Sequence, residues 1–109
     1  MQRNLPHIYI YIQLLKEKSL SPKDVMVFCS ITYMIFLTKK GCELNNIQLA
    51  KKNCTSPASI QRSLKKLSHL KYIQKTKENG KRIINIHLDM PYPEMLTELQ
   101  KLYSEDSTP

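Results

Sequence analysis

Residues 45–88 read NNIQLAKKNCTSPASIQRSLKKLSHLKYIQKTKENGKRIINIHL, and this stretch decides the fold. Two helix starts stand in its first half. Asn45 can cap a short helix that ends near Lys52, because its side chain can accept a hydrogen bond from a free amide and Gln48 follows three residues later. Ser56 and the proline after it begin a second helix. The sequence therefore predicts two short helices joined by a tight turn.

The second half of this stretch predicts a β-hairpin. Residues 72–77 and 82–88 flank Asn79-Gly80, which is the strongest short-range signal for a hairpin turn. The lysines then lie toward the tip of the hairpin, and the apolar residues lie toward the core. Counting outward from the turn pairs Lys77 with Arg82, Lys75 with Ile84, and Ile73 with Ile86.

An earlier helix precedes this stretch. Ser21-Pro22-Lys23-Asp24 carries a cap and a capping-box residue, and we expect the helix to run to about Thr38 and to stop at Gly41. Apolar residues surround nearly its whole circumference, so another layer of the fold must cover it.

The two ends of the chain carry weaker patterns. His7 to Leu14 alternates apolar and polar residues, which predicts an N-terminal strand. Glu94 to Tyr103 predicts an amphipathic helix, so we divide the chain into a domain of residues 1–90 and a C-terminal helix and tail of residues 91–109. The closing helix can fold back on its own chain or pair with a second copy. We favour a homodimer formed through the first and the C-terminal helices.

The distribution of charge points to a polyanionic partner. Residues 39–82 hold twelve Lys and Arg against two Asp and Glu, a net charge of +10, in a chain whose overall net charge is +8. Solubility alone does not require this concentration. The lysines do not lie on one amphipathic helix with a large apolar face, which argues against a membrane surface. Nucleic acid is the expected partner.

Cysteine usage indicates a reducing compartment. Cys29, Cys42 and Cys54 stand 13 and 12 residues apart without a CxxC pair, unlike a disulfide framework. A metal site built from Cys42, Cys54 and His69 would lack a fourth ligand. We therefore expect buried free thiols and no metal or cofactor. Residues 25–37 are apolar but shorter than the roughly 20 residues of a membrane span, so we expect a soluble cytoplasmic protein.

The order of helix, short helix, turn, basic helix and basic hairpin is that of a winged helix-turn-helix, an α+β and mainly helical fold with three core helices. Leu49-Ala50 with Cys54 and Ile60 match the spacing of a helix-turn-helix. Residues 56–67 followed by Tyr72-Ile73 resemble the helix-to-wing segment of bacterial winged-helix regulators and of plasmid and phage replication initiators. The resemblance spans about residues 20–88. It implies binding to double-stranded DNA in replication, transfer (conjugation) or transcription regulation. Cys54 and Lys71 depart from the pattern, because glycine is common at both places.

The resemblance also places the expected DNA-binding residues. The second helix of the motif enters the major groove, and the hairpin approaches the backbone or the minor groove. Gln61 and Arg62 are predicted to contact bases, since amide and guanidinium groups pair with adenine and guanine. The other expected contacts are Ser56, Ala58, Ser59, Lys65 and Lys66 on the helix, with Lys75, Lys77, Lys81 and Arg82 on the hairpin.

Two other classes of function remain. A winged-helix module can instead bind an acidic protein partner through the same basic surface. An enzyme fragment is the third interpretation, but the sequence has no glycine-rich phosphate loop, and His7, His69 and His87 have no nucleophile nearby in the sequence. We therefore expect no catalytic activity of the chain itself.

Overall fold

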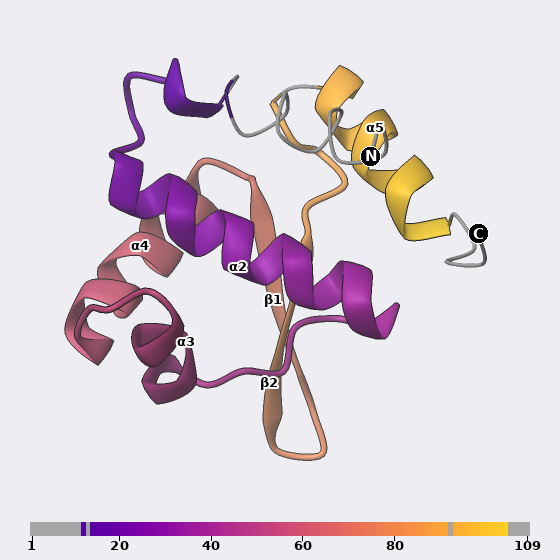
Figure 1. Cartoon of the computed structure of the whole chain (residues 1–109). Helices are drawn as coiled ribbons and strands as arrows, with labels where there is room; N and C mark the ends of the chain where they lie inside the picture. The colour runs from indigo at the N-terminus through magenta and orange to yellow at the C-terminus, as the bar shows by residue number, and fades with distance from the viewer. Residues whose placement is uncertain (1–11, 13, 92, 105–109) are drawn as a thin grey trace.

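The computed structural model describes residues 12, 14–91 and 93–104, and for residues 102–104 it describes the backbone alone. The chain is α+β and mostly helical. Figure 1 shows α2 crossing the molecule, with α3 and α4 on one side of it and α5 on the other side, toward its second half. The elements in order are α2 (Pro22–Thr38), α3 (Asn46–Lys52), α4 (Pro57–His69), β1 (Ile73–Glu78), β2 (Lys81–Ile86) and α5 (Pro93–Ser104).

The three predicted helix caps are confirmed. The hydroxyl of Ser21 accepts from the amide of Asp24 at 3.2 Å, and the Asp24 carboxylate accepts from the amide of Ser21 at 3.0 Å. Asn45 and Gln48 make the same reciprocal pair at the start of α3. Ser56 accepts from the amide three residues later at the start of α4. Each pair satisfies amides that the helix itself leaves free.

The predicted end of α2 at Thr38 is confirmed, but the residue that stops the helix differs from the prediction. The helix closes at Lys39, which takes a left-handed conformation with φ of 60° and donates its amide to the carbonyl of Ile35. Gly41 therefore does not stop the helix. Its role is a close approach, because a Cβ atom at this position would collide with the side chain of Ile83.

The predicted hairpin register is confirmed, including the pairing of Lys75 with Ile84. Asn79 and Gly80 both have positive φ, at 52° and 80°, as a type I′ turn requires. The structure adds one pairing that the sequence analysis did not predict. Cys42 forms an antiparallel bridge with Ile84, with N···O distances of 2.8 and 2.9 Å. This bridge ties the segment between α2 and α3 to the free edge of β2.

The predicted strand over residues 7–14 lies largely outside the described residues. For the two residues of this range that the structure describes, the prediction of a strand is wrong. Ile12 and Leu14 are helical, and they point in different directions: Leu14 is fully buried, whereas Ile12 is 45% exposed. A strand would place both on one face, because side chains two apart in a strand share a side. Among the described residues no strand is available to pair here, and a helical turn satisfies its backbone locally.

The core packs α2 against α4, the hairpin and α5. The rings of Phe28 and Tyr72 meet edge to face with their centroids 6.0 Å apart, and both side chains are buried. Met95 and Leu99 of α5 are buried in the same chain, and α5 contacts α2. The closing helix is thus folded back in this single chain, while the side chains of Leu102 and Tyr103 lie outside the described residues.

The α4 helix ends in a motif that normally favours glycine. The amide of Tyr72 donates to the carbonyl of Leu67 at 2.9 Å, and the amide of Lys71 donates to the carbonyl of Ser68 at 3.1 Å. This is a Schellman arrangement, and it holds Lys71 at φ of 66°. Cys54 has φ of 51° in the turn between α3 and α4. The two departures from the glycine pattern are therefore real positive-φ positions.

Lys71→Gly and Cys54→Gly are each expected to stabilise the protein by about 0.5–1 kcal/mol, because glycine carries no Cβ to strain a left-handed conformation. Both side chains are exposed, so their removal costs little packing. Urea denaturation measures the effect as a higher midpoint. Lys65→Gly is the matched control, since glycine inside α4 costs about 1 kcal/mol. A destabilised Lys71→Gly protein would contradict the strain argument.

Candidate nucleic-acid interface

One stripe of α4 points straight away from the core. Ile60, Leu64 and Leu67 are buried on the inner side of the helix. With 3.6 residues per turn, the opposite side carries positions separated by four, three and four residues. These positions are all exposed, and they are Ala58, Arg62, Lys65 and His69. The sequence analysis predicted the first three and missed His69, although the same spacing would have included it.

Polar side chains connect the first two turns of α4. The hydroxyl of Ser56 donates to that of Ser59 at 3.2 Å, and a terminal nitrogen of Arg62 donates to Ser59 at 3.0 Å. Arg62 therefore lies along the helix toward its amino end, while Gln61 is exposed on the neighbouring flank. The predicted serines, amide and guanidinium are brought together at one end of α4, which has no acidic residue.

Lys66 was predicted to contact a DNA phosphate, but in the structure it is paired with a carboxylate of the chain itself. Its ammonium lies 2.8 Å from the carboxylate of Asp24, whose side chain is 6% exposed, whereas the side chain of Lys66 is 45% exposed. Burial acts to raise the pKa of the Asp24 carboxyl, but hydrogen bonds from Lys66, Ser21 and Ser63 outweigh it and leave that pKa below its usual value. Asp24 is therefore a charged partner, and Lys66 is turned toward α2 rather than outward.

The four predicted hairpin residues do not share one face. Side chains alternate along a strand, and residues opposite one another in the register share a side. Lys75 and Lys77 are exposed on the side that also carries buried Ile73, which is the side turned toward the helices. Lys81 lies on the other side, 3.8 Å from Glu43. β1 contacts α4, so Lys75 and Lys77 are exposed on the strand that packs beside that helix.

Arg82 was predicted to contact DNA, but its guanidinium is bonded within the chain. It shares the inner side of the hairpin, but its two terminal nitrogens donate to the side-chain oxygen of Asn46 at 2.6 Å and to the carbonyl of Leu44 at 2.8 Å. Its Nε is buried and has no hydrogen-bond partner among the described residues. Burial lowers the pKa of the guanidinium. Arg82 fixes the hairpin to the start of α3 instead of presenting its charge on the surface.

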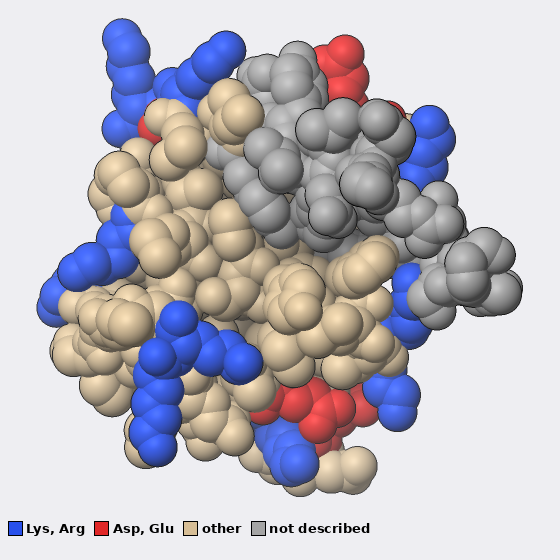
Figure 2. Space-filling view, in the orientation of Figure 1, with Lys and Arg blue, Asp and Glu red and all other residues tan. Residues whose placement is uncertain are grey.

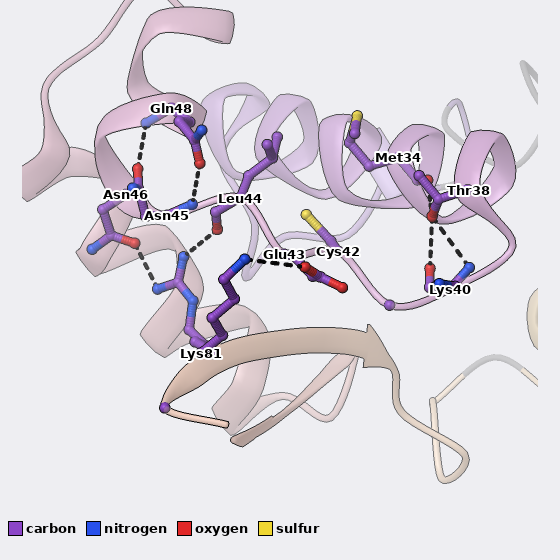
Figure 3. Close-up of a pocket in the computed structure, with 13 residues that line it drawn as sticks. Met34, Thr38, Lys40, Cys42, Glu43, Leu44, Asn45, Asn46, Gln48 and Lys81 are labelled. Carbon is purple, nitrogen blue, oxygen red and sulfur yellow. Dashed lines mark hydrogen bonds and ion pairs between the residues drawn. The ribbon is translucent and has the colours of Figure 1, made fainter. Parts of the chain in front are cut away.

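A cavity of about 960 Å³ lies between the end of α2, the α2–α3 connection and the hairpin tip. Figure 3 shows that most of its polar side chains already bond to backbone atoms or to other side chains of the cavity wall. Asn45 pairs with Gln48, Lys81 reaches Glu43, and Thr38 bonds the backbone of Lys40. These partners leave few free polar groups for a ligand, so we do not assign the functional site to this cavity.

The cysteines are free, as expected, but they are not all buried. Cys42 is buried, Cys29 is half-buried and Cys54 is exposed. Burial raises the pKa of the Cys29 thiol to about 12. The described residues contain no group of three His, Cys, Asp or Glu side chains placed to hold a metal ion. In the described part of the chain, no helix has the length and apolar character needed to cross a membrane.

Further basic side chains near the stripe were missed by the sequence analysis. Lys71 is exposed directly after α4, and Lys51 and Lys52 are exposed at the end of α3, one tight turn before α4. Their position could have been inferred from the two short helices, because the turn between them brings the end of α3 beside the start of α4.

Comparisons of the chain with protein-family models, with curated proteins and with solved structures find no match.

Proposed function

We propose that the chain is a winged-helix protein that binds double-stranded DNA, with α4 in the major groove and the β1–β2 hairpin on the backbone or the minor groove. The observation that carries the proposal is that exposed cations lie both on α4 and on the strand that follows it. Arg62 and Lys65 point outward from α4, and Lys75 and Lys77 extend from the adjoining strand on the side facing the helices. A groove of B-DNA admits one helix, and its phosphates attract lysines at the edge.

Each side chain then has a distinct role. Gln61 and Arg62 read bases, because their planar groups can make paired hydrogen bonds to adenine and guanine. Lys65, with the hydroxyls of Ser56 and Ser59 at the amino end of α4, holds phosphates and sets the register. Lys75 and Lys77 hold the backbone beside the groove. Arg82 and Lys66 then make no direct contact with DNA, because each is bonded within the chain. Lys81, which lies near Glu43, is at the edge of the proposed interface.

The biological setting follows from the resemblance to bacterial initiators and regulators. We propose a protein of a plasmid or phage that acts in replication, transfer or transcription regulation, without catalytic activity of its own. The lysine-, isoleucine- and asparagine-rich sequence suits a replicon of low GC content.

Arg62→Ala and Gln61→Ala are expected to relax sequence preference by about 1–3 kcal/mol at particular base pairs. The preferred sequence is first selected from a random duplex library with the unaltered protein. Competition between selected and single-base-changed duplexes then measures the preference of each variant. Both side chains are exposed, so the melting temperature should stay nearly unchanged. Equal loss of affinity for all sequences would contradict a base-reading role.

We also propose that the protein forms a homodimer, now chiefly through α2. Figure 2 shows that the middle of the face over α2 is uncharged, with lysine and arginine around its edge. Met26, Tyr33 and Leu37 share one side of α2 by helical spacing, and each is more than half exposed, at 55%, 54% and 55%. Exposed apolar surface with a polar rim is typical of protein interfaces. Because α5 already buries Met95 and Leu99 in its own chain, it contributes less than we expected.

Sedimentation at micromolar concentration tests the dimer. The expected result is a species of twice 12.8 kDa that dissociates when Tyr33 and Leu37 are replaced by glutamate, since charge on an apolar interface is costly. Leu88→Glu is the control, because Leu88 is 68% exposed and does not belong to α2. A single species near 12.8 kDa in every sample would show that the protein is a monomer.

A further inference from the structure

Asp24 forms the centre of a polar contact between α2 and α4. One carboxylate oxygen accepts from the hydroxyl of Ser63 at 2.7 Å, and the other accepts from the ammonium of Lys66 at 2.8 Å. The amide of Ser21 donates to the second oxygen as well, at 3.0 Å. Asp24 and Ser63 are 4% and 3% exposed, so this contact is closed to solvent on most sides.

The contact occupies one flank of α4 and leaves the outward stripe untouched. Ser59, Ser63 and Lys66 are spaced by four and three residues, so they follow one another along the flank that meets the start of α2. Lys65 is the next residue along the chain but belongs to the outward stripe. The two adjacent lysines of α4 therefore have different partners: Asp24 for Lys66, and solvent for Lys65.

We propose that Asp24 withholds Lys66 from the DNA backbone, so that α4 offers one phosphate-binding lysine where its sequence suggests two. This inference rests on the proposed DNA binding. A phosphate would have to displace a carboxylate that already lies at hydrogen-bond distance and that is nearly buried. Moving Lys66 to the phosphate would leave this buried negative charge with neutral donors alone, which is unfavourable.

The consequence is a lower affinity for every duplex, while the ratio of affinities between sequences stays the same. Contacts to phosphate carry no sequence information and supply the affinity for non-specific DNA. Withholding one of them weakens binding to every duplex alike, while Gln61 and Arg62 keep their reach to the bases. Asp24 is thus a positioning residue, because it acts on DNA only through Lys66.

The test is a matched set of variants whose binding to a random-sequence duplex is measured from 50 to 200 mM salt. Lys65→Gln is expected to lower the slope of log affinity against log salt by about 0.9, the value for one phosphate contact, whereas Lys66→Gln leaves it unchanged. Asp24→Asn frees Lys66 and is expected to steepen the slope by about 0.9, which is about 3.5-fold in affinity over this salt range. Adding Lys66→Gln to Asp24→Asn should restore the wild-type slope.

The outcomes separate this inference from the proposed function. A Lys66→Gln protein that loses as much slope as Lys65→Gln would overturn the inference while leaving DNA binding intact. So would a steeper slope in Asp24→Asn that persists after Lys66 is neutralised. If the wild-type protein shows no salt-dependent binding, the proposed function fails together with the inference. Should Asp24→Asn not fold, the comparison of Lys65→Gln with Lys66→Gln still decides, because both single variants retain the Asp24 carboxylate.

Discussion

Replacing Lys65, Lys75 and Lys77 together by glutamine is expected to flatten the salt dependence of duplex binding by about 2.7 units, at about 0.9 for each phosphate contact. Between 50 and 200 mM salt this corresponds to about a 40-fold smaller change in affinity. The physical reason is that each lysine releases condensed counterions when it meets a phosphate, and glutamine does not. All three side chains are exposed, so the melting temperature should change little.

The matched control removes the same charge elsewhere. Lys39, Lys40 and Lys101 are exposed at the end of α2 and on α5, and none of them belongs to α4 or to the two strands of the hairpin. Their joint replacement by glutamine is expected to leave the slope nearly unchanged. If both triple variants flatten the slope equally, binding depends on net charge alone, and the interface assigned to α4 and the hairpin is wrong.

Phe28→Ala is expected to destabilise the fold by about 3–5 kcal/mol, the usual cost of removing a buried aromatic side chain. Phe28 is fully buried on α2 and packs on Tyr72, which follows α4 and precedes β1. Its ring therefore holds together the two elements that form the proposed interface. Since small domains are stable by only about 5–15 kcal/mol, this loss is a large share of the total. Urea denaturation measures it.

Leu88→Ala is the control for this substitution. Leu88 is 68% exposed, so shortening its side chain is expected to cost less than about 0.5 kcal/mol. Duplex binding by Phe28→Ala at low temperature, where the variant is folded, should match that of the wild type. A stable Phe28→Ala protein would mean that the contact between α2 and Tyr72 does not organise the core.

Features of the fold that depend on residues close together in the sequence could be predicted from the sequence alone. The caps at Ser21, Asn45 and Ser56 depend on residues three apart, and the hairpin register depends on the type I′ turn at Asn79-Gly80. The inward side of α4 follows in the same way from helical spacing. These features could be predicted because each is fixed by its own few residues.

Contacts between distant segments could not be predicted in this way. The partners of Lys66 and Arg82 lie 42 and 36 residues away, at Asp24 and Asn46, so nothing in the local pattern marks these two cations as internally bonded. The pairing of Cys42 with β2 is similarly non-local. The distribution of charge along the sequence therefore predicts a positively charged surface. Only the structure shows which of the cations are bonded within the chain and which are exposed.

The salt dependence of wild-type binding to a random-sequence duplex tests the central claim most directly. If Lys65, Lys75 and Lys77 each meet a phosphate, affinity should fall at least about 40-fold between 50 and 200 mM salt. A duplex affinity that is absent at 50 mM salt, or that changes less than about twofold over this range, would contradict the account and favour an acidic protein as the partner of the basic surface.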